Sequence, residues 1–279
     1  MHLKKIIITI SSILIAFCIT LYFQNEQSVR SMNFDQYKIL QYSDNRSHSL
    51  VELNEKIVPF KLEDIIQDIF EKNRLAGEKT RVMELGAGNG RVLMELKKLF
   101  PEVEFYGINK EKTHTFYRRE SFIMTGLKFG LFNKAEIENT DLPYIVFQDL
   151  DFGNRIPYGE NKFDLIYSQD TIPHVRYTIE LFNEIMRVLK PKGLSIHTDV
   201  TGINIYDKGV LLDLKDATIE LRKRGIDIYV MDNPNSIRFR KKKDNLPFPL
   251  TPHIPIPTQT DNLSIEQRRP EMGYNLTYD

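Results

Sequence analysis

The sequence predicts an α/β fold, a doubly wound and mostly parallel sheet of seven strands whose last strand runs antiparallel. Two observations support it. Short apolar runs alternate along the chain with stretches of helical spacing, as in βαβ units. A glycine-rich turn stands between the first apolar run and the stretch that follows it. The composition is 41% hydrophobic and 27% charged, which is typical of a chain that buries a core.

We predict the strands from short apolar runs and the helices from apolar residues spaced three and four apart. The expected strands are short, apolar and bounded by turn residues. They cover residues 81–85, 103–108, 144–148, 163–168, 194–200, 226–231 and 236–241. The expected helices carry apolar residues at intervals of three and four, and they cover residues 61–72, 91–100, 114–124, 178–189 and 210–223.

Charge and cysteine content exclude several classes of function. Lys plus Arg and Asp plus Glu both number 38, so the formal net charge is zero. A protein that grips nucleic acid by neutralising phosphates is usually basic, and we therefore expect no nucleic-acid partner. Cys18 is the single cysteine, which excludes an intrachain disulfide. It lies in the apolar N-terminal stretch, so we expect neither a zinc site nor a cysteine nucleophile in the rest of the chain.

The N-terminal segment predicts a membrane anchor. Lys4 and Lys5 precede residues 6–23, which carry no charge. Eighteen helical residues span about 27 Å, close to the thickness of the hydrocarbon core. The run ends in Leu21-Tyr22-Phe23-Gln24, which lacks the small-x-small pattern of a cleavage site and places aromatic rings at an interface. We expect an uncleaved single-pass anchor, with a cleaved signal peptide as the alternative and the side of the membrane open.

The sequence Glu84-Leu-Gly-Ala-Gly-Asn-Gly90 predicts a ligand-binding loop. Glycines suit a turn with unusual backbone angles and a ligand that approaches the main chain, and the following helix start offers free N–H groups. The spacing differs from the dinucleotide pattern Gly-x-Gly-x-x-Gly, and Glu84 would repel a pyrophosphate. An NAD-linked oxidoreductase is therefore disfavoured. A tight turn without a ligand stays open as an alternative.

Three motifs together resemble one family. The loop is similar to the first motif of class I S-adenosylmethionine (SAM) dependent methyltransferases. The string Phe163-Asp-Leu-Ile-Tyr-Ser-Gln-Asp-Thr-Ile-Pro-His174 resembles the fourth-strand motif of the type 11 branch, and Arg187-Val-Leu-Lys-Pro-Lys-Gly193 the approach to strand five. Order and spacing match over roughly residues 78 to 200. The resemblance implies a Rossmann-like domain, SAM as cofactor and methyl transfer as activity.

The resemblance also implies where the cofactor binds. Glu84, Gly86, Ala87 and Gly88 would line the loop and hold the methionine end. Asn109 stands where the family usually has an acidic residue that binds both ribose hydroxyls. An amide can accept a hydrogen bond from one hydroxyl and donate one to the other, so Asn109 is expected to take this role.

Further site residues follow the third and fourth strands. Asp149 falls where the family places a contact to the adenine amino group, and Leu150 beside it would pack on the adenine ring. Ser168 and Gln169 end the fourth strand, at the edge of an α/β sheet where ligands bind. His174 is the candidate catalytic base, because imidazole titrates near neutrality; a histidine that orients the loop is the alternative.

The chain therefore divides into four expected parts: an anchor or signal over residues 1–24, a linker or irregular cap over 25–57, a methyltransferase domain over 58–245, and a tail over 246–279. The tail opens with five prolines in eleven residues, which favours an extended polyproline-like path. The basic run Arg238–Lys243 lies on an expected edge strand, where lysines commonly block edge-to-edge pairing.

These expectations combine into a membrane-tethered, SAM-dependent methyltransferase. Its acceptor is unidentified, and the tether favours a small molecule, a lipid or a glycan. The alternative function is a non-catalytic protein of the same fold that serves as an interaction module at a membrane. The sequence leaves the oligomeric state open.

Overall fold

The computed structural model describes residues 48–57, 59–109, 119–147, 155–175, 178–200, 205–207, 210–212, 214–223, 226–232 and 235–242. The described residues all belong to one compact unit, Arg46–Asp279. The expected N-terminal anchor and the proline-rich tail lie outside the described residues, as do Asp149 and Leu150. Within the described residues, no helix is long and apolar enough to span a bilayer.

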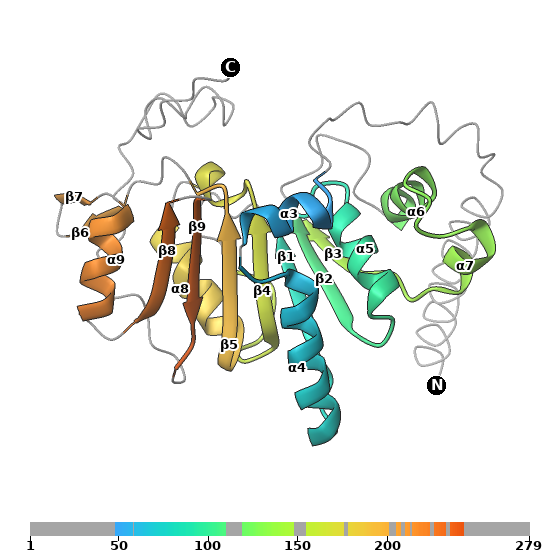
Figure 1. Ribbon diagram of the computed structural model, residues 1–279, viewed down its shortest axis with the longest axis horizontal. Coiled ribbons are helices and arrows are strands. Elements are labelled where there is room, and N and C mark those ends of the chain that lie inside the picture. The colour runs from blue at the N-terminus through green and yellow to red at the C-terminus, as the bar shows by residue number, and fades with distance from the viewer. Residues whose placement is uncertain are drawn as a thin grey trace, which may run out of the picture. The chain divides into compact units, whose positions relative to one another are not determined.

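The centre of the molecule is a seven-stranded sheet with strand order β3-β2-β1-β4-β5-β9-β8 (Figure 1). Strand β9 pairs antiparallel with both β5 and β8, and the other pairs are parallel, so the predicted fold class is confirmed. The strands are β1 (Arg81–Leu85), β2 (Glu104–Asn109), β3 (Tyr144–Phe147), β4 (Phe163–Gln169), β5 (Leu189–Thr198), β8 (Asp227–Asp232) and β9 (Asn235–Arg240).

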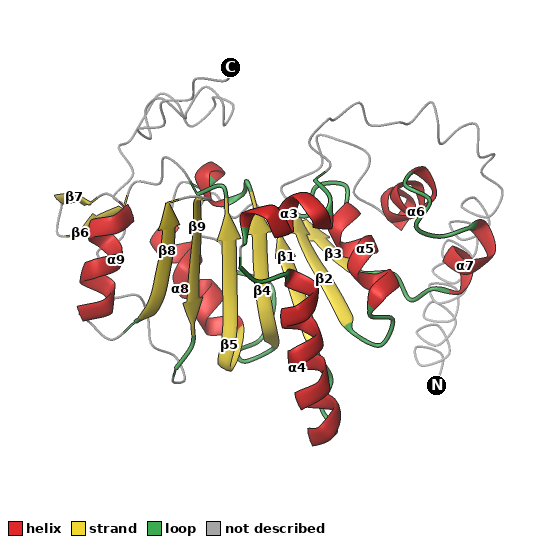
Figure 2. Ribbon diagram, viewed as in Figure 1, coloured by secondary structure: helices red, strands yellow, loops and turns green. Residues whose placement is uncertain are grey.

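Helices lie on both faces of the sheet, with α4 in front of it and α8 behind it in the view of Figure 2. Two helices are bounded by a glycine with left-handed backbone angles: Gly77 is the C-cap of α4 and Gly90 is the N-cap of α5. The helices are α3 (Leu50–Lys56), α4 (Leu62–Ala76), α5 (Arg91–Leu99), α6 (Arg119–Lys128), α7 (Lys134–Asn139), α8 (Thr178–Val188) and α9 (Leu214–Lys223).

The main apolar core lies between the sheet and α8. Leu181, Phe182 and Ile185 of α8 are buried together with side chains of β1, β4, β5, β8 and β9. The rings of Phe182 and Phe239 meet edge to face with centroids 5.4 Å apart. This packing fixes β4 and β5 side by side and so positions the residues that follow them.

Asp164, at the start of β4, ties the opposite end of the sheet together. The buried carboxylate accepts hydrogen bonds from the backbone N–H of Arg81 (2.8 Å) and the side-chain amide of Asn73 (3.0 Å). It also pairs with the ammonium of Lys190 at 2.8 Å. One side chain therefore links α4, β1, β4 and β5.

Two segments differ from the expected elements. The expected linker ends in helix α3, whose N-terminus carries a capping box between Ser49 and Glu52. The expected helix over residues 210–223 begins only at Leu214. Val210–Leu212 instead form strand β7, which pairs with β6 (Ile205–Asp207) in a separate two-stranded sheet. Three consecutive apolar residues suit a strand as well as a helix, and periodicity alone does not separate the two.

The prediction of an edge strand at the basic run is wrong. Strand β9 lies inside the sheet, between β5 and β8. The buried ammonium of Lys241 donates to Asn161 Oδ1 (2.6 Å) and to the carbonyl of Leu189 (2.9 Å). Arg238 donates to the carbonyl of Ile57 at 2.6 Å. These two cations hold parts of the fold together and do not guard an edge.

Candidate active site

The candidate site lies at the carboxyl ends of β1 and β4, which are neighbours in the sheet. From β1 the chain passes through α5 to β2 on one side, and from β4 it passes through α8 to β5 on the other. This reversal of strand order is the switch point at which open α/β sheets bind ligands. The geometry therefore brings together the glycine loop and the residues that end β4.

The glycine loop has the backbone that its sequence predicts. Gly86, Gly88 and Gly90 have φ angles of +70°, +52° and +75°. The N–H groups of Gly86 and Ala87 both donate to the carbonyl of Ile108, at 2.8 and 3.0 Å, which holds the loop against the end of β2. Ala87 therefore stabilises the loop conformation through its backbone N–H group.

Two of these glycines have different surroundings. A Cβ atom at Gly86 would lie 2.1 Å from the hydroxyl oxygen of Thr171. That hydroxyl lies 2.9 Å from the carbonyl oxygen of Leu85 and 3.0 Å from that of Gln169. A Cβ atom at Gly88 would meet no atom within 4 Å. Gly86 thus serves the packing of the two loops, whereas Gly88 borders open space that a ligand can enter.

Glu84 is a buried acidic residue, 5% exposed. Burial raises its pKa to about 8; the nearby charge of Glu95 adds to this rise, and a hydrogen bond from the Tyr167 hydroxyl (3.2 Å) opposes it. The pKa of Tyr167 is raised well above its ordinary value by burial and by Glu84. Glu84 is therefore mainly protonated at neutral pH, and a nearby cation would favour its ionised form.

Asn109, at the end of β2, reaches the glycine loop. Its side-chain amide nitrogen donates to the carbonyl of Gly88 at 2.9 Å. An aspartate could not make this bond, because an ionised carboxylate only accepts. The replacement of the family's usual acidic residue by an amide thus has a structural consequence, since Asn109 fixes the carbonyl of Gly88.

Ser168, one of the two expected cofactor-binding residues at the end of β4, has its side chain in the core. Its hydroxyl lies 2.7 Å from Nδ1 of His197, whose Nε2 lies 2.6 Å from the hydroxyl of Ser195. All three side chains are fully buried. Burial lowers the pKa of His197 to about 3, so the ring is neutral, with one nitrogen donating and the other accepting. This group joins β4 to β5.

Gln169 ends β4 at the switch point, the residue is 7% exposed, and both polar atoms of its carboxamide are buried. Neither its oxygen nor its nitrogen has a hydrogen-bond partner among the described residues. Leaving a buried polar group without a partner costs about 1–3 kcal/mol, so such groups in native proteins call for an explanation. A polar ligand at this edge would supply both missing bonds.

Helix α3 lies across the carboxyl ends of the central strands in Figure 1. Lys56 forms an ion pair of 2.7 Å with Asp199, the residue after β5. At the other end of the helix, the backbone N–H of Leu50 donates to Glu95 Oε2 at 2.6 Å. The helix thus bridges β5 and α5 next to the glycine loop, in a segment where the sequence predicts a linker or an irregular cap.

The remaining candidates are only partly described. The backbone of His174 lies in a short 3₁₀ helix, η1 (Ile172–His174), three residues after Thr171, but its side chain lies outside the described part. Asp149 and Leu150 lie outside it altogether. Among the described residues, no group of three or more His, Cys, Asp or Glu side chains could hold a metal ion.

Sequence reasoning missed two contributors to this site, Thr171 and Tyr167. Thr171 packs on Gly86, and Tyr167 donates to Glu84. The parallel register that pairs Glu84 with Tyr167 could have indicated the second contact, because residues paired across strands point to the same face. No local signal marks Thr171.

Comparison with known proteins supplies the family. A family model described as a methyltransferase domain matches residues 76–221. The chain belongs to this methyltransferase family. Its members use SAM as methyl donor, so the cofactor that the motifs predicted is confirmed and an NAD-linked oxidoreductase is excluded.

Two curated relatives and one solved structure illustrate the similarity. The glycine/sarcosine/dimethylglycine N-methyltransferase of Actinopolyspora halophila is 32% identical over 131 residues, 45% of this chain and 20% of that protein. The phosphoethanolamine N-methyltransferase 3 of Arabidopsis thaliana is 36% identical over 72 residues, 26% of this chain and 14% of that protein. The chain thus spans a fifth or less of either relative's length. A SAM-dependent methyltransferase from Aquifex aeolicus is 18% identical, covering 68% of this chain and 95% of its own, with a TM-score of 0.37.

Proposed function

We propose that this protein transfers the methyl group of SAM to the nitrogen of an amine, at the carboxyl ends of β1 and β4. The observation that carries the proposal is the carboxamide of Gln169, which is buried beside the glycine loop and has no hydrogen-bond partner in the part of the chain that the structure describes. The choice of nitrogen is supported by the names of the two curated relatives, which are both N-methyltransferases.

The residues present fit SAM. Gly88 leaves open space at the loop, and Gln169 offers one donor and one acceptor to the polar end of a ligand. The Glu84 carboxyl group would become ionised beside the ammonium of the methionine moiety. Asn109 holds the loop carbonyl at Gly88 and so keeps the loop in shape. Asp149 and Leu150 remain proposed contacts to the adenine.

When bound, SAM supplies a methyl group that is already activated on a sulfonium. The chain then has to align the acceptor and exclude water. Helix α3 and its ion pair between Lys56 and Asp199 cover the edge where this alignment would take place. An amine attacks through its lone pair, so a base that removes its proton is useful, and His174 is the candidate.

We further propose that residues 1–24 tether the enzyme to a membrane as a single-pass anchor. The uncharged run over residues 6–23 supports this proposal. A tethered enzyme can meet acceptors in the bilayer as well as in solution. The proposed acceptor is therefore an amine on a small molecule or on a lipid head group.

The test is SAM binding and methyl transfer by the full chain in lipid nanodiscs. Gln169→Leu is expected to weaken SAM binding by about tenfold, the equivalent of roughly 1.4 kcal/mol. The matched control is Gln67→Leu, at an exposed glutamine of α4 that donates to Glu71 in the same helix. It should leave the affinity unchanged.

Radiolabelled SAM would then be offered with glycine, sarcosine, phosphoethanolamine and a lipid extract. Label on an amine supports the proposal. Label on oxygen or carbon alone would refute the acceptor atom but keep the enzyme. SAM binding without transfer to any acceptor would favour the non-catalytic interaction module instead.

A further inference from the structure

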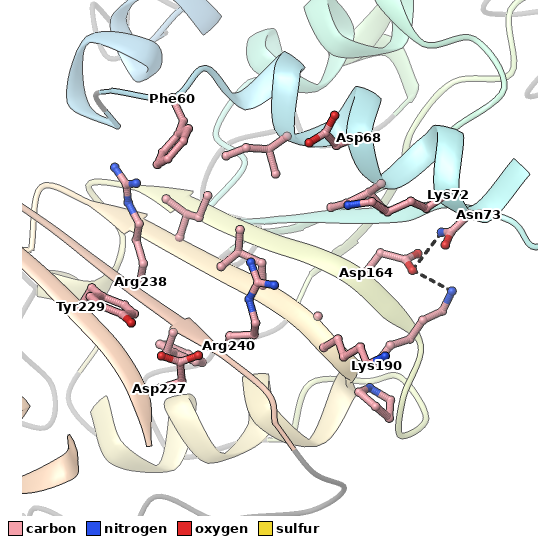
Figure 3. A pocket seen from close by; sticks show the side chains of 18 of the residues that line it. Phe60, Asp68, Lys72, Asn73, Asp164, Lys190, Asp227, Tyr229, Arg238 and Arg240 are labelled. Atoms are coloured by element: carbon pink, nitrogen blue, oxygen red, sulfur yellow. Dashed lines mark hydrogen bonds and ion pairs between the residues drawn. The ribbon is translucent and has the colours of Figure 1, made fainter. Parts of the chain in front are cut away.

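A groove of about 860 Å³ lies on the sheet, away from the candidate active site. One wall is α4, and the floor is formed by β5, β9 and β8 (Figure 3). Its apolar lining includes Ile65 and Ile69 of α4 and Leu194 and Ile196 of β5. This volume lies in the range of pockets that bind small ligands, so the groove is large enough to hold a ligand or a peptide segment.

Two aromatic side chains on the rim are unusually exposed. Phe60, before α4, is 56% exposed and Tyr229, on β8, is 57% exposed. Arg238 lies between them, with its guanidinium carbon 5.7 Å from the centre of the Phe60 ring. Exposed aromatic rings beside an apolar groove are typical of a surface that another segment covers.

In the part of the chain that the structure describes, no helix covers this face of β9 and β8. Figure 1 shows α8 behind these strands, α9 beside β8 at the end of the sheet and α4 further along the sheet, and Leu221 of α9 belongs to the same buried core as α8. Among the described residues, this face of β9 and β8 therefore carries no second layer of structure beside α4, whereas open α/β sheets are usually covered on both faces.

The chain itself leaves the sheet at one end of this groove. The backbone of Lys241 pairs with Lys192 and Gly193, which line the groove, through bonds of 2.7 and 3.0 Å. Strand β9 ends there, and 37 of the 279 residues follow Lys242. The tail therefore starts within a few residues of the groove.

The first part of the tail has the composition of a groove-binding segment. Residues 245–260 contain no Asp, Glu, Lys or Arg, and Leu246, Phe248 and Leu250 alternate with prolines. A polyproline II segment has no internal hydrogen bonds and rises about 3.1 Å per residue, so residues 246–257 would span about 37 Å. A six-residue strand spans about 20 Å, so the segment is long enough to cross the floor. Aromatic-lined grooves commonly bind such segments.

We propose that residues 246–257 dock in this groove as an extended segment and cover Phe60 and Tyr229. The tail then acts as an intramolecular strap over the open face of β9 and β8. We assign the groove to this chain's own tail for two reasons. The tail starts next to Lys192 and Gly193 at one end of the groove, and the segment contains no Asp, Glu, Lys or Arg whose charge would have to be buried.

The test uses the absence of tryptophan from the chain. Phe60→Trp places a single fluorescent reporter on the rim, in the full chain and in a version that stops after Lys242. We expect emission at shorter wavelength in the full chain, a shift to longer wavelength on truncation, and recovery when a peptide of residues 243–260 is added. Leu75→Trp is the control: this leucine is 81% exposed at the end of α4, and its emission should not respond to the tail.

Equal emission of the two Phe60→Trp proteins, or no response to the peptide, would overturn the proposal. A shift that depends on protein concentration would also overturn it, in favour of a second copy of the chain. If the truncated chain fails to fold, a disulfide decides. In the full chain with Cys18→Ser, the pair Tyr229→Cys and Leu250→Cys should cross-link within one molecule on mild oxidation, and the pair Leu75→Cys and Leu250→Cys should not. Failure of the first pair to cross-link would again overturn the proposal.

Discussion

At the scale of single residues, Gly86 and Gly88 share left-handed backbone angles but differ in what lies beside them. Gly86→Ala adds a Cβ atom 2.1 Å from the Thr171 hydroxyl, and we expect it to destabilise the fold by more than 2 kcal/mol, about 1–2 for the backbone angle and the rest for the clash. Gly88→Ala meets open space, so it should cost only about 1–2 kcal/mol. Its methyl group would obstruct the ligand, and SAM binding should weaken by at least about tenfold.

Urea unfolding and calorimetric SAM titration would separate these two effects. Gly130→Ala is the matched control, because Gly130 also has a left-handed angle of +62° and open surroundings but follows α6. It should cost as much stability as Gly88→Ala without changing SAM affinity. Equal affinities for the Gly88→Ala and Gly130→Ala variants would show that the loop does not approach the cofactor.

The buried carboxyl of Glu84 makes a second residue-scale prediction. Its pKa is about 8 in the folded protein and near 4.5 when the chain is unfolded. Below pH 4.5 both states are protonated and the folded state bears no penalty. Between pH 4.5 and 8 the carboxyl group is ionised in the unfolded state but still protonated in the folded state. The free energy of unfolding therefore falls as the pH rises, by at most about 1.4 kcal/mol for each pH unit.

Glu84→Gln removes this titration. We therefore expect its free energy of unfolding, relative to that of the unsubstituted protein, to rise between pH 5 and pH 8. The matched control is Glu138→Gln on the exposed side of α7, for which the difference should stay constant. A constant difference for Glu84→Gln as well would mean that the carboxyl group is ionised in the fold.

At the scale of secondary-structure elements, Asp164 joins α4, β1, β4 and β5 through one buried carboxylate. Asp164→Ala leaves the Arg81 N–H and the Lys190 ammonium without this partner, and we expect it to destabilise the fold by about 3–5 kcal/mol. Asp164→Asn keeps one acceptor and should cost less. Chemical denaturation would measure both. Glu71→Ala, which breaks an exposed pair with Arg74, should cost less than about 1 kcal/mol, and a similar value for Asp164→Ala would contradict the prediction.

The elements that were predictable from sequence are those whose burial sets a clear period. The strands β1 and β4 are almost wholly buried, and each contains a short apolar stretch, Val82-Met83 in β1 and Leu165-Ile166-Tyr167 in β4. Helix α7 was missed because it has six residues, of which only Ile137 is buried. Both α7 and α3 carry capping boxes, at Asn133 and Ser49, and that local signal could have revealed them. The interior position of β9 depends on long-range pairing, which no local pattern encodes.

The candidate site was predictable to the extent that it depends on local backbone. The glycine loop and the end of β4 follow from motifs, and the structure brings Gly88 and Gln169 to the same edge of the sheet. The direction in which Ser168 points does not follow, because it depends on a neighbour 29 residues away, His197. The bond from Asn109 to the loop carbonyl likewise exists only once β1 and β2 are paired.

At the scale of the whole molecule, the proposed tether makes the last prediction. Residues 6–23 carry no charge, and an arginine at the middle of a transmembrane helix costs about 2.5–3.5 kcal/mol of insertion free energy. We expect the full chain to stay with membranes through an alkaline carbonate wash, and Ile10→Arg combined with Ile15→Arg to release it. Val51→Arg is the control, because this side chain is exposed on α3 and a charge there should change nothing. Release of the unsubstituted chain, or a mature mass lacking the first 24 residues, would replace the anchor with a cleaved signal and would move the acceptor search from bilayer lipids to soluble amines.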